Sequence, residues 1–323
     1  MLELADRWIW DFWLAPERVD GRWHVYFLQA PRSLGDPHLR HENASIGHAT
    51  SSDLVDWNDV EDALAPGQDG AFDDRATWTG SIVAGPDSQW WLFYTGTVRA
   101  EHGLVQRVGA ATSTDLRRWS KVAGLLVEAD ARWYERYDPA LGQEGLATTA
   151  GYSQAWRDPW VMRHPDGDGW LMLTTARRSS GPREGRGVFG VARSHDLRTW
   201  HVGPPIEAGD EFGQFEVPQL LRIADRWAVG FCTGAANHAP ARQARGAPIW
   251  TGNGVIVADA LEGPWHVCDE PFLGAPHYAA RIVELDGRLL ALSWLDVVDG
   301  VFRGALADPI DVTDTLTAMV ARI

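Results

Sequence analysis

The sequence predicts an all-β fold, a five-bladed β-propeller, because strand-like units repeat along its 323 residues while helical periodicity is nearly absent. The clearest unit is a small-residue strand followed by Ser-x-Asp-Leu and, three residues on, a Trp. Its copies are IGHATSSDLVDW (46–57), VGAATSTDLRRW (108–119), FGVARSHDLRTW (189–200) and a degenerate GVIVADALEGPW (254–265).

Two other strand-like runs precede each copy and complete the repeat. The runs rich in aromatic and apolar residues are RWHVYFL (22–28), QWWLFYT (89–95), GWLMLTT (169–175), RWAVGFC (226–232) and RLLALSW (288–294). The runs before these are IWDFWLA (9–15), GSIVAG (80–85), DPWVMRH (158–164), VPQLLRI (217–223) and YAARIVEL (278–285). Five such units without intervening helices are typical of five antiparallel sheets around a channel, so we expect one propeller over residues 1–323.

The repeated turn of this unit has a structural interpretation. We expect the aspartates of the repeated Ser-x-Asp-Leu motif to brace turns and its tryptophans to pack between blades. These residues are Asp53, Asp115, Asp196, Trp57, Trp119 and Trp200.

Composition excludes several classes of partner. The formal net charge is −15, which argues against nucleic acid, and 18 tryptophans suit the stacking of sugar faces on indole. Two cysteines, Cys232 and Cys268, make neither a disulfide framework nor a metal motif, so we expect no metal and no cofactor. The start of the chain does not resemble a signal peptide and no run is long enough to span a membrane, so we expect a cytoplasmic protein without membrane partners.

Acidic residues recur where the first strand of a blade begins. The first strands of a propeller line its channel, so side chains at their starts should meet at one mouth of that channel. Blade 1 offers Asp11, blade 3 Asp158 and blade 4 Glu216, whereas blade 2 offers Trp78-Thr79-Gly80-Ser81 and blade 5 His277-Tyr278. The fold would therefore gather three carboxylates that lie far apart in the sequence.

Three carboxylates at one mouth suit glycoside cleavage. That reaction needs a protonated acid for the leaving oxygen and an ionised carboxylate near the anomeric carbon, while a third can hold sugar hydroxyls. Arg157, next to Asp158, would keep that aspartate ionised and donate to sugar oxygens. We therefore expect a small saccharide as substrate. The candidate substrate-binding residues are Trp10, Trp13, Gln29, Trp78, Thr79, Ser81, Arg157, His277 and Tyr278.

At these residues the chain resembles glycoside hydrolase family 32, in the clan of β-fructofuranosidases and levansucrases. The matching motifs are WHVYFLQAP (23–31) with IGHATSSDLVDWNDVEDALAPG (46–67), WTGS (78–81) with WWLFYTG (90–96), RDP (157–159) and Glu216-Val217-Pro218. The resemblance implies a retaining reaction on β-linked fructofuranosides, by hydrolysis or fructosyl transfer. It implies Asp11 as nucleophile, Asp158 as transition-state stabiliser and Glu216 as acid/base.

Three departures from the family pattern stand out. The Trp10-Asp11-Phe12-Trp13 stretch is nearer to the Trp-Asp-x-Trp pattern of levansucrases than to Asn-Asp-Pro-Asn-Gly, and Val217 replaces the usual Cys. The family also normally carries a C-terminal β-sandwich, for which we expect no room here.

Two other functions compete with this interpretation. One is an inverting five-bladed glycosidase acting on arabinofuranosides or xylosides, which also uses two Asp and one Glu. The other is a non-catalytic sugar-binding propeller. We also expect the insertions 97–107 and 128–156 to rim the pocket, with Tyr134, Tyr137 and Trp156 narrowing it toward small substrates.

Overall fold

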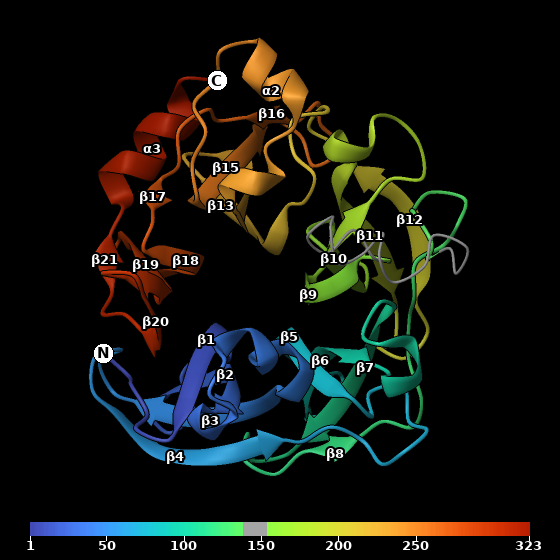
Figure 1. Cartoon of the computed structure of the whole chain (residues 1–323), viewed down its shortest axis with the longest axis vertical. Coiled ribbons are helices and arrows are strands. Elements are labelled where there is room, and N and C mark those ends of the chain that lie inside the picture. Colours follow the sequence, from blue (N-terminus) through green and yellow to red (C-terminus); the bar gives the residue numbers. More distant parts are fainter. Residues whose placement is uncertain (138–153) are drawn as a thin grey trace.

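The computed structural model describes residues 1–137 and 154–323 and contains five antiparallel sheets arranged around a central axis (Figure 1). Each sheet is one blade, and its strands follow one another along the chain from the axis outward. The all-β, five-bladed prediction is therefore confirmed. Within the described residues, none of the helices is long and apolar enough to cross a membrane.

The strands fall where the repeats predict them. Blade 1 has β1 Arg7–Leu14, β2 Trp23–Pro31, β3 Ser45–Ser51 and β4 Trp57–Leu64; blade 2 has β5 Ala76–Ala84, β6 Trp90–Thr97, β7 Gln106–Ser113 and β8 Ser120–Lys121. Blade 3 has β9 Trp156–Arg163, β10 Trp170–Arg177, β11 Gly187–Ser194 and β12 His201–Ile206; blade 4 has β13 Glu216–Ile223, β14 Arg226–Thr233, β15 Gly252–Ala258, β16 His266–Val267 and β17 Leu273–Gly274. Blade 5 has β18 His277–Leu285, β19 Arg288–Val298, β20 Val301–Leu306 and β21 Ile310–Asp311.

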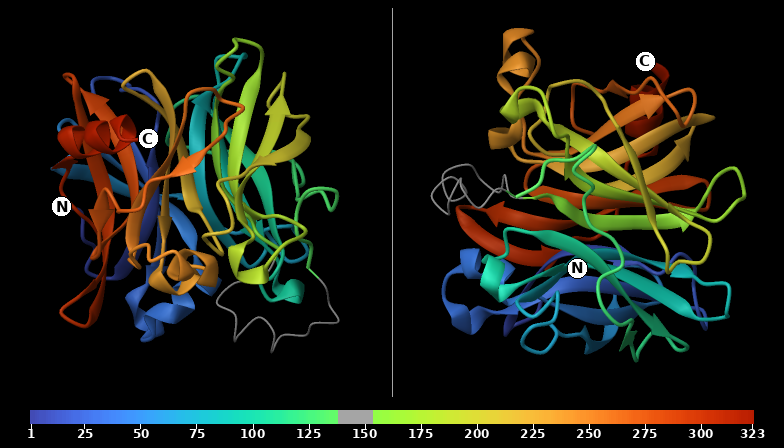
Figure 2. Two further views of the ribbon diagram at one scale, coloured as in Figure 1. Left: turned by 90° about the horizontal axis from the view of Figure 1, so that it is seen from above. Right: turned by 90° about the vertical axis from the view of Figure 1, so that its right-hand side faces the viewer.

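Short helical segments lie in the connections. They are η1 Arg32–Leu34, η2 Pro37–Asn43, η3 Arg99–Glu101, η5 Arg183–Gly185, η6 Ala235–Asn237, α2 Pro240–Ala244 and α3 Thr313–Ala321. The sequence did not predict α3, which buries Leu316, Met319 and Val320 against apolar residues of blades 4 and 5. Figure 2 shows the blue η2 segment and the orange α2 segment on one face of the ring.

The repeated turn motif performs the structural role expected of it. In its first copy, Ser51 Oγ accepts from the Leu54 N–H at 2.8 Å, and Asp53 Oδ1 accepts from the N–H groups of Val55 and Asp56 at 2.9 Å each. Asp115 and Asp196 make the equivalent bonds. These hydrogen bonds favour the ionised form and lower the pKa of all three aspartates.

Aromatic side chains join neighbouring blades. Trp119 of blade 2 meets Tyr26 of blade 1 edge to face, with ring centroids 5.7 Å apart. Trp200 of blade 3 meets Phe93 of blade 2 in the same way, at 5.5 Å. The prediction that these tryptophans pack between blades is confirmed for both, and the apolar core runs through the blade interfaces.

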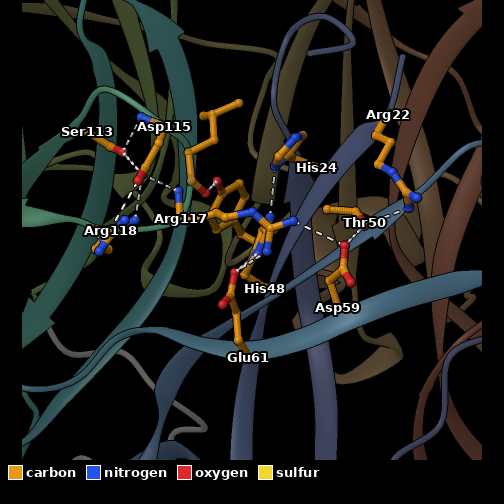
Figure 3. Close-up of polar contacts among 12 residues, drawn as sticks. Arg22, His24, His48, Thr50, Asp59, Glu61, Ser113, Asp115, Arg117 and Arg118 are labelled. Carbon is orange, nitrogen blue, oxygen red and sulfur yellow. Dashed lines mark hydrogen bonds and ion pairs between the residues drawn. The ribbon is translucent and has the colours of Figure 1, made fainter. Parts of the chain in front are cut away.

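Polar contacts also join blades 1 and 2 (Figure 3). His24 Nδ1 lies 2.9 Å from His48 Nε2, and His48 Nδ1 lies 3.0 Å from Glu61 Oε1. Arg117 of blade 2 donates to Glu61 Oε1 at 2.9 Å and to Asp59 Oδ2 at 3.1 Å. Because the Glu61 carboxylate accepts, His48 carries its proton on Nδ1 and accepts from His24 through Nε2.

A backbone bridge between Leu2 and Leu306 closes the ring. The Leu2 N–H donates to Leu306 O at 3.0 Å and the Leu306 N–H donates back to Leu2 O at 2.9 Å. This bridge attaches the start of blade 1 to the third strand of blade 5. Figure 1 accordingly places the N-terminus beside β20. The closed ring fixes the channel on which the five first strands converge.

Candidate active site

All five first strands carry a β-bulge near the channel. The residues outside the regular pairing are Asp11 in β1, Thr79 in β5, Asp158-Pro159 in β9, Val217-Pro218 in β13 and Ala279-Ala280 in β18. A bulge bends its strand and turns side chains away from the regular alternation. The repeated bulge therefore directs side chains from separate blades toward one space.

The bulges hold an unusual backbone. Asp158 and Val217 adopt left-handed φ angles of 56° and 54°, a conformation that costs about 1–3 kcal/mol for such residues. Their N–H groups donate across blade boundaries: that of Asp158 to Thr95 Oγ1 of blade 2 at 2.9 Å, and that of Val217 to Asp158 Oδ2 of blade 3 at 3.2 Å. In blade 2, Gly80 leaves no room for a side chain, since a Cβ there would lie 2.0 Å from Phe93 O.

A cavity of about 300 Å³ lies where these strands meet. Its lining residues are Trp10, Asp11, Leu28, Arg40, His41, Trp78, Thr79, Arg157, Asp158, Glu216, Val217, Tyr278, Trp294 and Asp296. The three predicted catalytic acids thus line one space, together with five of the predicted substrate-binding residues: Trp10, Trp78, Thr79, Arg157 and Tyr278.

Asp11 is held by two neutral donors. Thr79 Oγ1 donates to its Oδ2 at 2.8 Å, and Trp294 Nε1 donates to its Oδ1 at 2.9 Å. Loss of solvent around the carboxyl group and the nearby charge of Asp158 raise the pKa of Asp11 to about 6. The group is therefore ionised at pH 7, with its orientation fixed by blades 2 and 5.

Asp158 is almost fully buried. Its Oδ2 accepts from Thr175 Oγ1 at 2.7 Å and lies 3.5 Å from Arg157 Nε. Burial raises the pKa of Asp158 although Arg157 and the hydrogen bonds oppose that rise. The carboxylate thus has partners on its own strand, on β10 and, through the Val217 N–H, on blade 4, which together fix its position.

Glu216 is held between an arginine and a phenol. Arg157 Nη2 donates to its Oε1 at 2.7 Å, and Tyr278 Oη donates to its Oε2 at 2.6 Å. Arg157 is itself held by Gln106 and Gln214. Burial favours the neutral form of Arg157, but the negative charges of Asp158 and Glu216 outweigh that effect and raise its pKa. Glu216 keeps 23% of its side chain exposed, so it remains accessible to a ligand in the cavity.

A second buried cation lies among the bulges. Arg281 of β18 donates to Phe12 O at 3.3 Å, Val217 O at 3.2 Å and Pro218 O at 2.7 Å, and its guanidinium faces the ring of Trp160. One side chain from blade 5 thus contacts blades 1, 3 and 4. Burial lowers its pKa to about 10, against the opposing charges of Asp158 and Asp11, so it stays protonated.

Four predicted substrate-binding residues lie outside the cavity lining. Trp13 is fully buried and stacks on Tyr26 in blade 1, while Gln29 bonds to Arg7 and Asp62. Ser81 Oγ accepts from the Val161 N–H and joins blades 2 and 3, and His277 Nδ1 lies 2.7 Å from Ser293 Oγ. All four are engaged in contacts within or between blades.

The expectation for the second insertion is also corrected. Tyr134 and Trp156 do not line the cavity: their rings meet edge to face at 4.9 Å inside the core between blades 2 and 3. Tyr134 Oη further donates to Gly203 O at 2.8 Å. Tyr137 is not among the lining residues either, and residues 138–153 of this insertion lie outside the described residues.

The sequence argument missed six lining residues: Leu28, Arg40, His41, Val217, Trp294 and Asp296. Arg40 and His41 lie on η2, an insertion between the second and third strands of blade 1. Trp294 and Asp296 lie on β19, a second strand. A search of first strands alone cannot find these four residues, although the Arg-His pair in the 32–43 insertion was an available signal. Val217 lies on a first strand, directly after Glu216.

The arrangement suits chemistry between two carboxylates. Asp11 is ionised at pH 7 and oriented by neutral donors, as an attacking group requires, and Glu216 is within reach of a ligand. Asp158 and Arg157 offer an acceptor and donors for sugar hydroxyls. Among the described residues, no group of three or more His, Cys, Asp and Glu side chains is arranged to hold a metal ion.

The chain is similar to a family of glycosidases. The family model described as "Glycosyl hydrolases family 32 N-terminal domain" matches residues 15–304. A sucrose-6-phosphate hydrolase of Pediococcus pentosaceus is 28% identical over 286 residues, which is 85% of this chain and 50% of that protein. A fructan 6-exohydrolase of Triticum aestivum is 30% identical over 237 residues, 69% of this chain and 35% of that protein. The chain thus spans half or less of the length of these relatives.

Solved structures share the fold. An inulosucrase from Halalkalicoccus jeotgali bound to kestose superposes with a TM-score of 0.76 at 20% identity, covering 96% of this chain and 87% of that one. A levansucrase from Gluconacetobacter diazotrophicus gives 0.72 at 15% identity, covering 96% and 79%.

Proposed function

Because the chain belongs to glycosyl hydrolase family 32, we propose that it cleaves β-fructofuranosides, by hydrolysis or fructosyl transfer, through a covalent fructosyl-enzyme. The relatives named as sucrose-6-phosphate hydrolase and fructan 6-exohydrolase support the hydrolytic reaction. The observation that carries the proposal is the convergence of Asp11, Asp158 and Glu216 on one cavity, each with different partners.

The first step assigns one role to each acid. Asp11 attacks the anomeric carbon of the fructosyl group while protonated Glu216 gives its proton to the departing glycosidic oxygen. The carbon–oxygen bond to the leaving group breaks as the ester bond to Asp11 forms. Asp158 binds fructosyl hydroxyls, and that contact tightens as positive charge develops on the sugar ring.

The second step reverses the role of Glu216. Its carboxylate takes a proton from water, or from the hydroxyl of an acceptor sugar, which then attacks the same carbon and releases Asp11. Two inversions at one carbon give overall retention of configuration. Arg157 and Tyr278 hold the Glu216 carboxyl group through both steps by the contacts described above.

The test is turnover on a panel of sucrose, inulin, levan oligomers and difructose anhydrides, with the Asp11→Asn and Asp158→Asn variants. Asp11→Asn should lose more than nine-tenths of the rate on the best substrate and remain folded by circular dichroism. Asp158→Asn should lower kcat far more than it raises KM, because its contact strengthens in the transition state. Retention of a tenth of the wild-type rate by Asp11→Asn would remove it from the nucleophile role.

The two alternatives are tested in the same panel. The match to family 32 disfavours an inverting arabinofuranosidase or xylosidase, and turnover of aryl arabinofuranosides or xylosides without turnover of fructosides would reverse that preference. Saccharide binding with no turnover of either class would favour a sugar-binding propeller.

A further inference from the structure

Two cavity residues have a charge that the proposed reaction does not use. Arg40 comes from η2 of blade 1, and Asp296 comes from β19 of blade 5, two residues after the Trp294 that binds Asp11. Both side chains are half-buried. Arg40 packs its guanidinium against the rings of Trp10 and Phe302, with centroid distances of 5.6 Å and 4.3 Å. These contacts fix Arg40 in the cavity wall.

Neither side chain has its hydrogen bonds satisfied within the described part of the chain. Arg40 Nη1 donates to Pro37 O at 2.9 Å, but its buried Nε has no partner there. The Asp296 carboxylate accepts no hydrogen bond from a described residue, and burial raises its pKa. The Arg40 guanidinium and the Asp296 carboxylate both line the cavity, so they can serve as a donor and an acceptor there, as a ligand rich in hydroxyl groups requires.

The charges of the cavity are unbalanced. Four carboxylates line it, those of Asp11, Asp158, Glu216 and Asp296, against the two guanidinium groups of Arg40 and Arg157. Arg157 is already bound to Glu216, which leaves Arg40 as the uncommitted cation of the described lining, with Asp296 nearby.

Other positive charges do not reach a ligand in the cavity. Arg281 is protonated, but it lies outside the lining and donates to the carbonyl groups of Val217 and Pro218. Desolvation in the cavity and the neighbouring Arg40 lower the pKa of His41, so its imidazole is neutral at pH 7. Residues 138–153 contain Asp138 and Glu144 but no Lys, Arg or His, so this segment offers no cation. A phosphate group entering beside the four carboxylates of the cavity lining would meet repulsion that the Arg40 guanidinium does not balance.

Resting on the proposed function, we propose that Arg40 and Asp296 select the leaving group: they bind hydroxyls of a neutral saccharide and exclude a phosphorylated one. Arg40 donates to the leaving group, and Asp296 accepts from it and repels anions. This preference for a neutral substrate differs from the phosphorylated substrate for which the relatives called sucrose-6-phosphate hydrolase are named. Discrimination then comes from a repulsive element as well as an attractive one.

The experiment compares kcat/KM for sucrose and sucrose 6-phosphate at pH 7. The wild-type protein should favour sucrose by at least about 100-fold, and the ratio should shrink in 0.5 M salt because charge repulsion is screened. Asp296→Asn should narrow the ratio about tenfold by improving the phosphorylated substrate. Asp299→Asn is the matched control, since it removes the same charge from an exposed residue in the β19–β20 turn, outside the cavity lining. It should leave the ratio unchanged.

Arg40→Gln separates the two possible roles of the arginine. If Arg40 donates to hydroxyl groups, Arg40→Gln should lower kcat/KM for sucrose at least as much as kcat/KM for sucrose 6-phosphate. A selective loss on sucrose 6-phosphate would identify Arg40 as a phosphate anchor and overturn the proposal. A wild-type preference for sucrose 6-phosphate, or equal effects of Asp296→Asn and Asp299→Asn, would also overturn it.

Binding keeps this test independent of turnover. Asp11→Asn protein should bind sucrose at least about 100-fold more tightly than sucrose 6-phosphate in calorimetric titrations, and adding Asp296→Asn should narrow that gap. If the wild-type protein turns over neither substrate but the binding ratio holds, the proposed reaction on sucrose fails while the selectivity stands. If turnover is normal and the ratio is absent or reversed, only the selectivity fails.

Discussion

Arg157 joins two acids of the site, because its Nη2 lies 2.7 Å from Glu216 Oε1 and its Nε lies 3.5 Å from Asp158 Oδ2. The planar guanidinium can face both carboxyl groups at once, whereas an ammonium group presents a single point of charge. Asp158 and Glu216 come from neighbouring blades, so this side chain fixes their relative position together with the Val217 N–H, which donates to Asp158.

Arg157→Lys should therefore damage activity although it keeps the charge. Loss of the planar guanidinium removes at least one hydrogen bond to a charged group, so kcat/KM should fall about 10- to 100-fold. Arg163→Lys, on the same strand but exposed and outside the cavity, is the matched control and should leave both kinetic constants unchanged. Wild-type kinetics in Arg157→Lys would show that charge alone is sufficient.

The pKa of Asp11 predicts the acid side of the pH profile. The nucleophile must be ionised, and its pKa is about 6, so kcat/KM should fall tenfold per pH unit below pH 6. Trp294→Phe removes a donor that favours the ionised form, so the pKa should rise and the acid limb should move up by roughly one pH unit. Trp78→Phe is the control, because its indole donates to His41 O and not to Asp11. An unmoved limb in Trp294→Phe would assign that limb to another group.

The sequence predicted the positions that repeat and missed those that do not. Strand repeats located every blade, and the starts of first strands located Asp11, Asp158 and Glu216, because a propeller turns equal positions in the repeat into neighbours in space. Trp294 was missed because it lies on a second strand and reaches Asp11 only through closure of blade 5 onto blade 1. Trp13 was assigned to the site because a motif does not say which way a side chain points once a bulge interrupts the strand.

Arg281 should position the acids through the backbone and through its charge. Arg281→Met leaves the carbonyl groups of Val217 and Pro218 without this donor, at a cost of about 1–3 kcal/mol for each buried group left unpaired. It also removes a cation near Asp11 and Asp158, so the acid limb of kcat/KM should move to higher pH. Arg281→Lys should lose stability but keep the limb in place, because the charge remains. If the acid side of the kcat/KM profile lies at the same pH in wild type and in folded Arg281→Met, Arg281 has only a structural role.

The histidine pair of blade 1, His24 and His48, should make stability depend on pH (Figure 3). Burial lowers the pKa of His48 to about 4, whereas an unfolded histidine titrates near 6.5. Between these values the unfolded chain binds a proton that the native protein does not, so stability falls as pH drops, by up to about 1.4 kcal/mol per pH unit. His48→Gln should reduce the slope of unfolding free energy against pH between 6.5 and 4 by up to about 1.4 kcal/mol per pH unit, while other buried histidines such as His238 retain part of it. His195→Gln, at an exposed histidine, should leave the slope as in the wild type, and an equal slope in all three proteins would contradict the assignment.

Glu216 is the acid whose role is best tested by chemical rescue. As acid/base it must protonate the leaving oxygen in the first step and deprotonate the attacking water in the second. Glu216→Ala should therefore slow substrates with poor leaving groups by at least about 100-fold, yet spare the first step for an activated leaving group that needs no proton. With such a substrate the fructosyl-enzyme should accumulate and be visible by mass spectrometry of the intact protein.

Azide then distinguishes the mechanisms. It attacks without general-base help, so it should restore turnover of the activated substrate by Glu216→Ala and give a fructosyl azide of retained configuration. Asp11→Asn provides the comparison, because without the nucleophile no fructosyl-enzyme forms and azide cannot give the retained product. An inverted product from Glu216→Ala would instead mean direct displacement, as in an inverting arabinofuranosidase or xylosidase. Equal rate losses on activated and unactivated substrates, without rescue, would remove Glu216 from the acid/base role and leave its bonds to Arg157 and Tyr278 as structural contacts.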